Sequence, residues 1–137
     1  MSLYLIHSIE DLDKFAQTMA EHIPFGSLVF LRGELGVGKT AFCRAFLKAL
    51  GYVGTVKSPT YTLVESYEVP KGIVHHFDLY RLRSPEELEW LGWRDYLQKN
   101  ALCLIEWPEK AGETLPMPNV DICFFYHEND QRRIEVR

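Results

Sequence analysis

The sequence predicts an α/β protein of three layers, with a mixed sheet that has a parallel centre and antiparallel additions. Three observations carry this prediction. Short apolar runs at residues 27–32 and 101–105 have the composition of strands buried on both faces of a parallel sheet. A glycine-rich turn joins the first run to a segment of helical periodicity. Paired β-rich segments at residues 60–80 and 120–136 are typical of antiparallel hairpins.

Length and charge limit the possible functions. The 137 residues fit one domain, 1–137, and a chain of this size buries enough apolar surface to fold without disulfides. The net charge is -4, which argues against a broad basic surface for nucleic acid. Any contact with RNA is therefore expected to be indirect or local.

The N-terminal residues, the length of the apolar runs and the cysteines bear on the cellular compartment. Residues 1–7 lack the basic segment and long apolar core of a signal peptide, and no apolar run approaches the roughly 20 residues of a membrane span. Cys43, Cys103 and Cys123 lie far apart in apolar segments, without a CxxC or a Cys/His cluster. We expect a cytoplasmic protein with no membrane association, with buried reduced thiols and no zinc site.

Helical spacing defines the first half of the chain. Ser8 is expected to cap a helix that runs to about Ile23, with Asp11 three residues after the cap. A strand at residues 27–32 follows, and then a helix at residues 39–50 that ends at a glycine.

The second half alternates strands and turns. Residues 60–69 and 73–80 are expected to pair as a hairpin, and SPEE at residues 84–87 predicts the start of a helix ending at Leu91. The run at 101–105 is expected to be a strand with Glu106 at its carboxyl end. Residues 120–126 and 133–136 should form a closing hairpin.

The turn at residues 33–40, GELGVGKT, has the pattern G-x-x-x-x-G-K-[ST] of a phosphate-binding loop. Glycines let the main chain approach phosphate oxygens, and successive N–H groups at a helix start form an anion-binding hollow. Lys39 would reach the β- and γ-phosphates, and Thr40 would offer its hydroxyl to Mg²⁺. Because a strand precedes the turn and a helix follows it, we predict a P-loop NTPase-like fold. The expected cofactor-binding residues are Gly33, Glu34, Leu35, Gly36, Val37, Gly38, Lys39, Thr40, Ala41 and Thr60.

Two acids are candidates for the metal and for hydrolysis. Glu106 follows an apolar strand, and Asp78 lies at the end of another. Either could hold Mg²⁺ while the other orients the attacking water. The alternative is that each acid caps a helix or pairs with an arginine such as Arg81. His75 and His76 alternate across a strand, with one expected to face solvent, and receive no role.

The polar segment at residues 57–62, KSPTYT, follows the helix of the phosphate loop. Switch segments of nucleotide hydrolases lie at this place, where a hydroxyl can sense the γ-phosphate. Thr60 is the candidate. A plain loop that leads into a strand is the alternative.

Five motifs in this order resemble the bacterial TsaE family, formerly YjeE, over residues 8–118. They are GELGVGKT, SPTYTLVESY, HHFDLYRL, EELEWLGWRDYL and LIEWPEKAGETLP. The resemblance implies a P-loop ATPase that binds ATP or ADP and is needed to form threonylcarbamoyladenosine beside the anticodon of certain tRNAs. It also implies TsaD- and TsaB-like partners, on which ATP hydrolysis would act as a switch.

The resemblance assigns roles to individual residues. Lys39, Asp78 and Glu106 would be the catalytic residues, with Thr40 and Glu106 at Mg²⁺. Trp107 matches a family hallmark that could cover the nucleotide or dock a partner, although a buried aromatic is the plainer interpretation.

Two other functions remain open at this level. A small-molecule P-loop kinase would need an acceptor site and an arginine-rich lid, for which few residues remain. A non-catalytic nucleotide-binding adaptor would not need two acids. No arginine finger is placed by motif; Arg44 and Arg81 are the candidates, and a partner could supply the charge.

Overall fold

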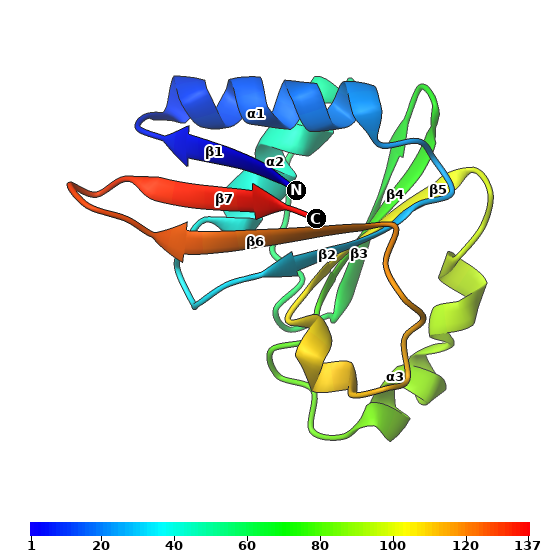
Figure 1. The fold of residues 1–137 in the computed structure, drawn as a ribbon. Coiled ribbons are helices and arrows are strands. Elements are labelled where there is room, and N and C mark those ends of the chain that lie inside the picture. The colour runs from blue at the N-terminus through cyan, green and yellow to red at the C-terminus, as the bar shows by residue number, and fades with distance from the viewer.

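The protein, in a computed structural model that describes residues 1–137, is built on one seven-stranded sheet (Figure 1). The strands lie in the order β1-β7-β6-β2-β5-β4-β3. Their bounds are β1 Ser2–Ile6, β2 Leu28–Arg32, β3 Val64–Val69, β4 Gly72–Asp78, β5 Ala101–Glu106, β6 Val120–Tyr126 and β7 Arg132–Val136. The four central strands, β6, β2, β5 and β4, are parallel. Strands β1 and β7 at one edge and β3 at the other pair antiparallel, which confirms the predicted mixed sheet.

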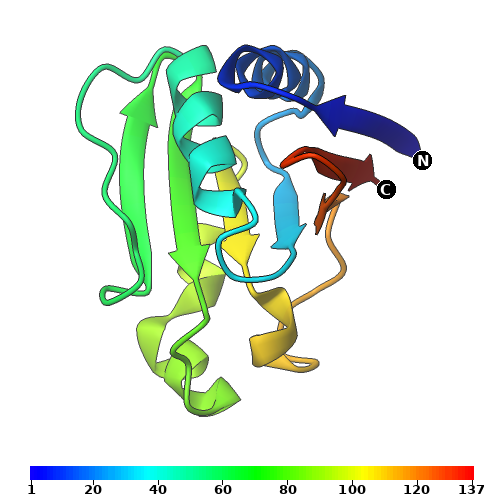
Figure 2. The same ribbon diagram turned by 90° about the vertical axis from the view of Figure 1, so that its left-hand side faces the viewer.

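Helices cover both faces of this sheet. Their bounds are α1 Ile9–His22, α2 Lys39–Ala49 and α3 Pro85–Leu91, with two short 3₁₀ helices, η1 Trp93–Tyr96 and η2 Pro108–Ala111. One apolar cluster joins α1 and α2 to the sheet, and a second joins α3, η1 and η2 to it. Figure 2 shows α2 lying against the sheet and leading out of the turn that follows β2. The protein therefore has the three layers that the sequence predicts.

Strand β2 lies at the centre of both clusters. Val29 and Leu31 belong to the cluster under α1 and α2, whereas Leu28 and Phe30 belong to the cluster on the opposite face. Side chains alternate between faces along a strand, so a run that is apolar throughout fits a strand covered on both sides. This burial fixes the end of β2, from which the phosphate loop starts.

The helix starts follow their predicted signals with one difference. Ser8 caps α1, and its Oγ accepts a hydrogen bond from the N–H of Asp11 at 3.2 Å. Ser84 precedes α3 without a side-chain cap. There the Glu87 carboxylate accepts a hydrogen bond from the N–H of Arg83 at 2.6 Å, one residue before the expected position.

Several segments differ from the predictions. Strand β1 is not predicted, because its pairing with β7 is made by the main chain and leaves Leu3 and Leu5 exposed. The strand expected from residue 60 begins only at Val64. Leu63, at φ 69°, turns the chain, and its N–H donates to the Pro59 carbonyl at 2.8 Å. The strand expected to reach residue 80 ends at Asp78.

The C-terminal hairpin is confirmed. Asn129 and Asp130 form its turn at φ 56° and 60°, the left-handed values that tight hairpin turns require. None of the helices combines the length and apolar character needed to cross a membrane.

Candidate functional site

The phosphate loop (residues 33–40) joins β2 to α2 and depends on glycine for two different reasons. Gly33 is crowded: a Cβ there would lie 2.8 Å from the Phe124 carbonyl oxygen and 2.8 Å from Cγ1 of Val37. Gly38 is open, with nothing within 4 Å of such a Cβ, but its φ of 122° is one that side chains rarely adopt. The space beside Gly38, at the start of α2, is where main-chain N–H groups can meet an anion.

Lys39 places a buried ammonium group at this loop. Its side chain donates a hydrogen bond to the Gly33 carbonyl, and Nζ lies 3.8 Å from the centroid of the Trp107 ring. Burial lowers the pKa of Lys39, and the carboxylates of Glu106, Glu109 and Asp78 oppose that effect. A charged phosphate oxygen beside this ammonium would likewise favour its charged form.

Thr40 and Glu106 bring a hydroxyl and a carboxylate together. Thr40 Oγ1 donates to Glu106, at 3.1 Å from Oε2 and 3.3 Å from Oε1. The Glu106 Oε2 atom also lies 2.6 Å from Nε2 of His76. Only 2% of Glu106 is exposed, so its carboxylate is held by specific donors rather than by solvent.

Asp78 lies beside Glu106 because the two are register partners on the parallel strands β4 and β5. Its Oδ2 accepts a hydrogen bond from Thr60 Oγ1 at 3.2 Å, and its Oδ1 accepts one from the Tyr80 N–H at 3.0 Å. The suggested pairing of Asp78 with Arg81 is wrong: the Arg81 guanidinium stacks on the Tyr61 ring at 4.6 Å. The segment expected to be a switch therefore does contact one of the two acids.

A pocket of about 290 Å³ collects most of these groups. Its lining residues are Leu35, Gly36, Gly38, Lys39, Thr40, Ala41, Thr60, Asp78, Glu106 and Trp107. Nine of these ten were expected from the sequence, and Trp107 was noted there without a fixed role. Three expected cofactor-binding residues do not line the pocket. The Gly33 carbonyl accepts a hydrogen bond from Lys39, Glu34 is exposed to solvent and Val37 is buried.

Trp107 closes one side of the pocket. It adopts the left-handed conformation at φ 56°, so the chain bends directly after Glu106. Its half-buried ring packs against Tyr80, with ring centroids 5.0 Å apart, as well as against Lys39. The expectation of a plainly buried aromatic is wrong.

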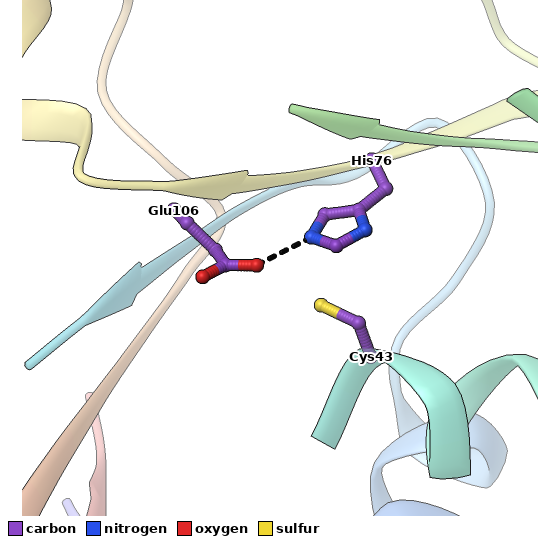
Figure 3. A group of neighbouring side chains, drawn as sticks. All are labelled: Cys43, His76 and Glu106. Atoms are coloured by element: carbon purple, nitrogen blue, oxygen red, sulfur yellow. Dashed lines mark hydrogen bonds and ion pairs between the residues drawn. The ribbon is translucent and has the colours of Figure 1, made fainter. Parts of the chain in front are cut away.

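A second group of side chains lies beneath the pocket, and no sequence motif indicates it. Cys43, His76 and Glu106 are all buried, and one ligand-type atom from each lies within 4.8 Å of the others (Figure 3). They come from α2, β4 and β5, so spacing along the chain does not bring them together. The sequence itself contains no Cys/His cluster, but the fold brings one cysteine and one histidine together, and the expectation of no zinc site stays a prediction. The thiols are free and buried, as expected.

One signal could have found His76. Side chains at i and i+2 of a strand share a face, so a buried Asp78 at a strand end places His76 on its side of the sheet. His75 faces the other way, packs on Tyr96 at 4.8 Å between ring centroids and lies 2.7 Å from the Ser66 hydroxyl.

The arrangement combines four elements of phosphate chemistry. It holds an anion-binding turn, a buried ammonium, a hydroxyl beside a carboxylate, and a second carboxylate on the adjacent strand. Oxygen donors of this kind are the ligands that Mg²⁺ prefers. The site is thus equipped to hold a polyphosphate with a divalent cation, and to orient a water with the remaining acid.

The comparisons with known proteins point to one family. A family model described as "Threonylcarbamoyl adenosine biosynthesis protein TsaE" matches residues 6–134. A TsaE protein of Haemophilus influenzae is 46% identical over 124 residues, which are 90% of this chain and 78% of the relative. One from Bacillus subtilis is 33% identical over 91% of this chain and 78% of the relative. Both carry the name tRNA threonylcarbamoyladenosine biosynthesis protein. The crystal structure of Bacillus subtilis YdiB aligns with 97% of this chain and 82% of its own, at 27% identity and a TM-score of 0.82.

Proposed function

The chain belongs to the TsaE family, and on this premise we propose that it is a Mg²⁺-dependent ATPase acting in threonylcarbamoyladenosine formation on tRNA. In this proposal it works as a nucleotide switch on TsaD- and TsaB-like partners. The family name supports the pathway. The pocket at the phosphate loop supports the nucleotide chemistry.

One observation carries the ATPase proposal: the Thr40 hydroxyl and the Glu106 carboxylate meet at 3.1 Å beside the open space at Gly38. An anion-binding turn alone could hold any phosphate. A hydroxyl and a carboxylate at its helical end add the oxygen donors that a Mg²⁺–nucleotide needs, so the residues fit the group. Thr40 and Glu106 would hold the Mg²⁺, which when bound would neutralise charge on the nucleotide phosphates.

The remaining groups have separate tasks in the proposal. Lys39 exchanges its bond to the Gly33 carbonyl for phosphate oxygens, which are stronger acceptors because they are charged. Asp78 is free of arginine partners and orients the attacking water. Thr60 reports the nucleotide state to the rest of residues 57–62 through its bond to Asp78.

The lining of the pocket favours ATP hydrolysis assisted by partner proteins over transfer of the phosphate to a metabolite. Its lining includes no arginine. Arg81 is stacked on Tyr61, and Arg44 lines a different groove, between α1 and α2. A kinase would hold several arginines over the phosphates, whereas a switch can receive one from a partner. We therefore expect slow turnover alone and faster turnover in the assembly.

The first test is nucleotide binding by Lys39→Ala. Removing a buried charge–phosphate contact should weaken ATP affinity by at least about tenfold, and isothermal titration calorimetry measures this directly. Unchanged affinity in a folded variant would place the nucleotide elsewhere and overturn the proposed site.

The second test separates the acids. With the partner proteins present, Asp78→Asn should lower the rate of phosphate release by about 100-fold or more while leaving ATP affinity nearly unchanged. In the Glu106→Gln variant the rate of phosphate release should no longer depend on the Mg²⁺ concentration. Wild-type rates in both variants would remove the catalytic claim, and phosphate found on a metabolite rather than in solution would favour the kinase.

A further inference from the structure

His76 lies directly beneath the carboxylate of Glu106 and is fully buried. It stands two residues before Asp78 on β4, so it projects from the same face of the sheet as Asp78 and Glu106. Figure 3 shows its ring turned toward Glu106, with the Cys43 thiol of α2 close to both side chains. His76 does not line the pocket.

The hydrogen bond between these two residues has a defined direction. Nε2 lies 2.6 Å from Oε2 of Glu106, whereas buried Nδ1 has no partner. A proton on Nδ1 would be a buried donor without an acceptor, so the proton belongs on Nε2. His76 therefore donates to Glu106, and its free Nδ1 is an acceptor.

This arrangement costs the fold free energy. A buried acceptor without a donor is unfavourable, and an apolar side chain of similar size would pack between β4, β5 and α2 without that cost. The benefit is the second donor on Glu106: Oε2 receives His76 from below and Thr40 from the side of the pocket.

We infer that His76 is a positioning residue that fixes the Glu106 carboxylate in the orientation that serves the divalent cation. The inference rests on the proposed function. Two donors from different elements leave a carboxylate little freedom to rotate, and hydrogen bonds to a metal-binding carboxylate commonly strengthen metal binding by 10- to 100-fold. His76 acts only through Glu106.

A metal held by Cys43, His76 and Glu106 themselves is the competing interpretation. Around one Zn²⁺, nitrogen and oxygen ligands at about 2.0 Å stand about 3.3 Å apart. Nε2 and Oε2 are closer than that, at 2.6 Å, and are joined by a hydrogen bond. Burial, with Glu106 and Asp78 nearby, also raises the pKa of Cys43 well above its usual value, so the side chain is held as a neutral thiol.

The test compares three variants by the Mg²⁺ concentration that gives half-maximal ATP hydrolysis in the presence of the partner proteins. His76→Met fills the space without a donor and should raise that concentration 10- to 100-fold. His76→Gln carries an amide N–H where Nε2 stood and should stay within about fivefold of wild type. His75→Gln, on the opposite face, is the matched control and should behave as wild type.

Two further measurements separate positioning from packing. The affinity for nucleotide without Mg²⁺ and the midpoint of thermal unfolding should differ little between the Met and Gln variants. A packing defect in one of the variants would instead change both quantities. In the wild-type protein, ¹H–¹⁵N spectra of the imidazole should show protonated Nε2 and bare Nδ1. That result needs no variant to fold.

Any of three results overturns the inference. The first is a Met variant with wild-type Mg²⁺ dependence, and the second is a Met variant with the same shift as the Gln variant. The third is an imidazole protonated on Nδ1 alone. Failure of the proposed function looks different: there Glu106→Gln itself would leave the Mg²⁺ dependence unchanged.

Discussion

Cys103 shows how burial sets the chemistry of a single residue. It lies within β5, where burial raises the pKa of its thiol from the ordinary 9.0 to about 12, and its Sγ lies 3.4 Å from the Tyr96 carbonyl oxygen. Below pH 9.0 the thiol is protonated in both the folded and the unfolded chain. Between pH 9.0 and about 12 the unfolded chain loses a proton that the folded chain keeps. The free energy of unfolding must therefore fall as pH rises through that window.

Cys103→Ala should reduce this alkaline loss of stability. One raised thiol contributes a slope of about 1 kcal/mol per pH unit. Urea unfolding of the wild type and the variant at pH 8, 9.5 and 10.5 measures the difference. The variant should be less stable at pH 8 because the substitution leaves a cavity. The difference in free energy of unfolding between the wild type and the variant should narrow as pH rises. A constant gap across the series would contradict the raised pKa.

Helix caps provide a matched comparison at the level of elements. Ser8 caps α1 with a side-chain hydrogen bond, whereas Ser84 stands at the same position of α3 without one. Ser8→Ala should therefore lower the free energy of unfolding by about 1 kcal/mol. Ser84→Ala should cost only a few tenths, since it removes no cap bond. Thermal melts of the two variants test this, and equal losses would contradict it.

The helices and central strands could be predicted because their signals are local. The cap at Ser8 and the apolar run at residues 27–32, which became β2, need no knowledge of distant neighbours. Strand β1 could not be predicted, because exposed Leu3 and Leu5 do not mark a buried face and the strand exists through its pairing with β7. Local patterns thus define elements that bury their own apolar face.

The same distinction applies to the candidate site. Residues 33–40 form one continuous motif, and Asp78 and Glu106 lie at the ends of apolar strands, so pattern alone placed most of the pocket lining. The side chains that hold these groups come from other elements. The roles of His76 and Trp107 depend on which strands become neighbours, which spacing does not reveal.

At the scale of the whole molecule, the C-terminal hairpin supports the phosphate loop. Tyr126 Oη, at the end of β6, donates to the Leu35 carbonyl at 2.9 Å. Arg132 Nε, at the start of β7, donates to the Val37 carbonyl at 3.1 Å, and its guanidinium stacks 4.6 Å from the Tyr126 ring centroid. The hairpin is far from the loop in sequence and matched no motif. These bonds satisfy two carbonyls of the loop from a distant part of the chain, so the hairpin helps to hold the loop in its shape.

Arg132→Ala should therefore weaken ATP binding without removing any group that lines the pocket. One lost hydrogen bond of ordinary strength corresponds to an affinity about two- to tenfold lower, because the loop must be ordered again when the nucleotide binds. Arg133→Ala is the control: this neighbour stacks on Phe125 and pairs with Glu135, away from the loop. Calorimetric titration with ATP, alongside thermal melts, distinguishes the two effects. If both variants bound ATP as the wild type does, the loop would hold its shape unaided and the hairpin would contribute only to the sheet.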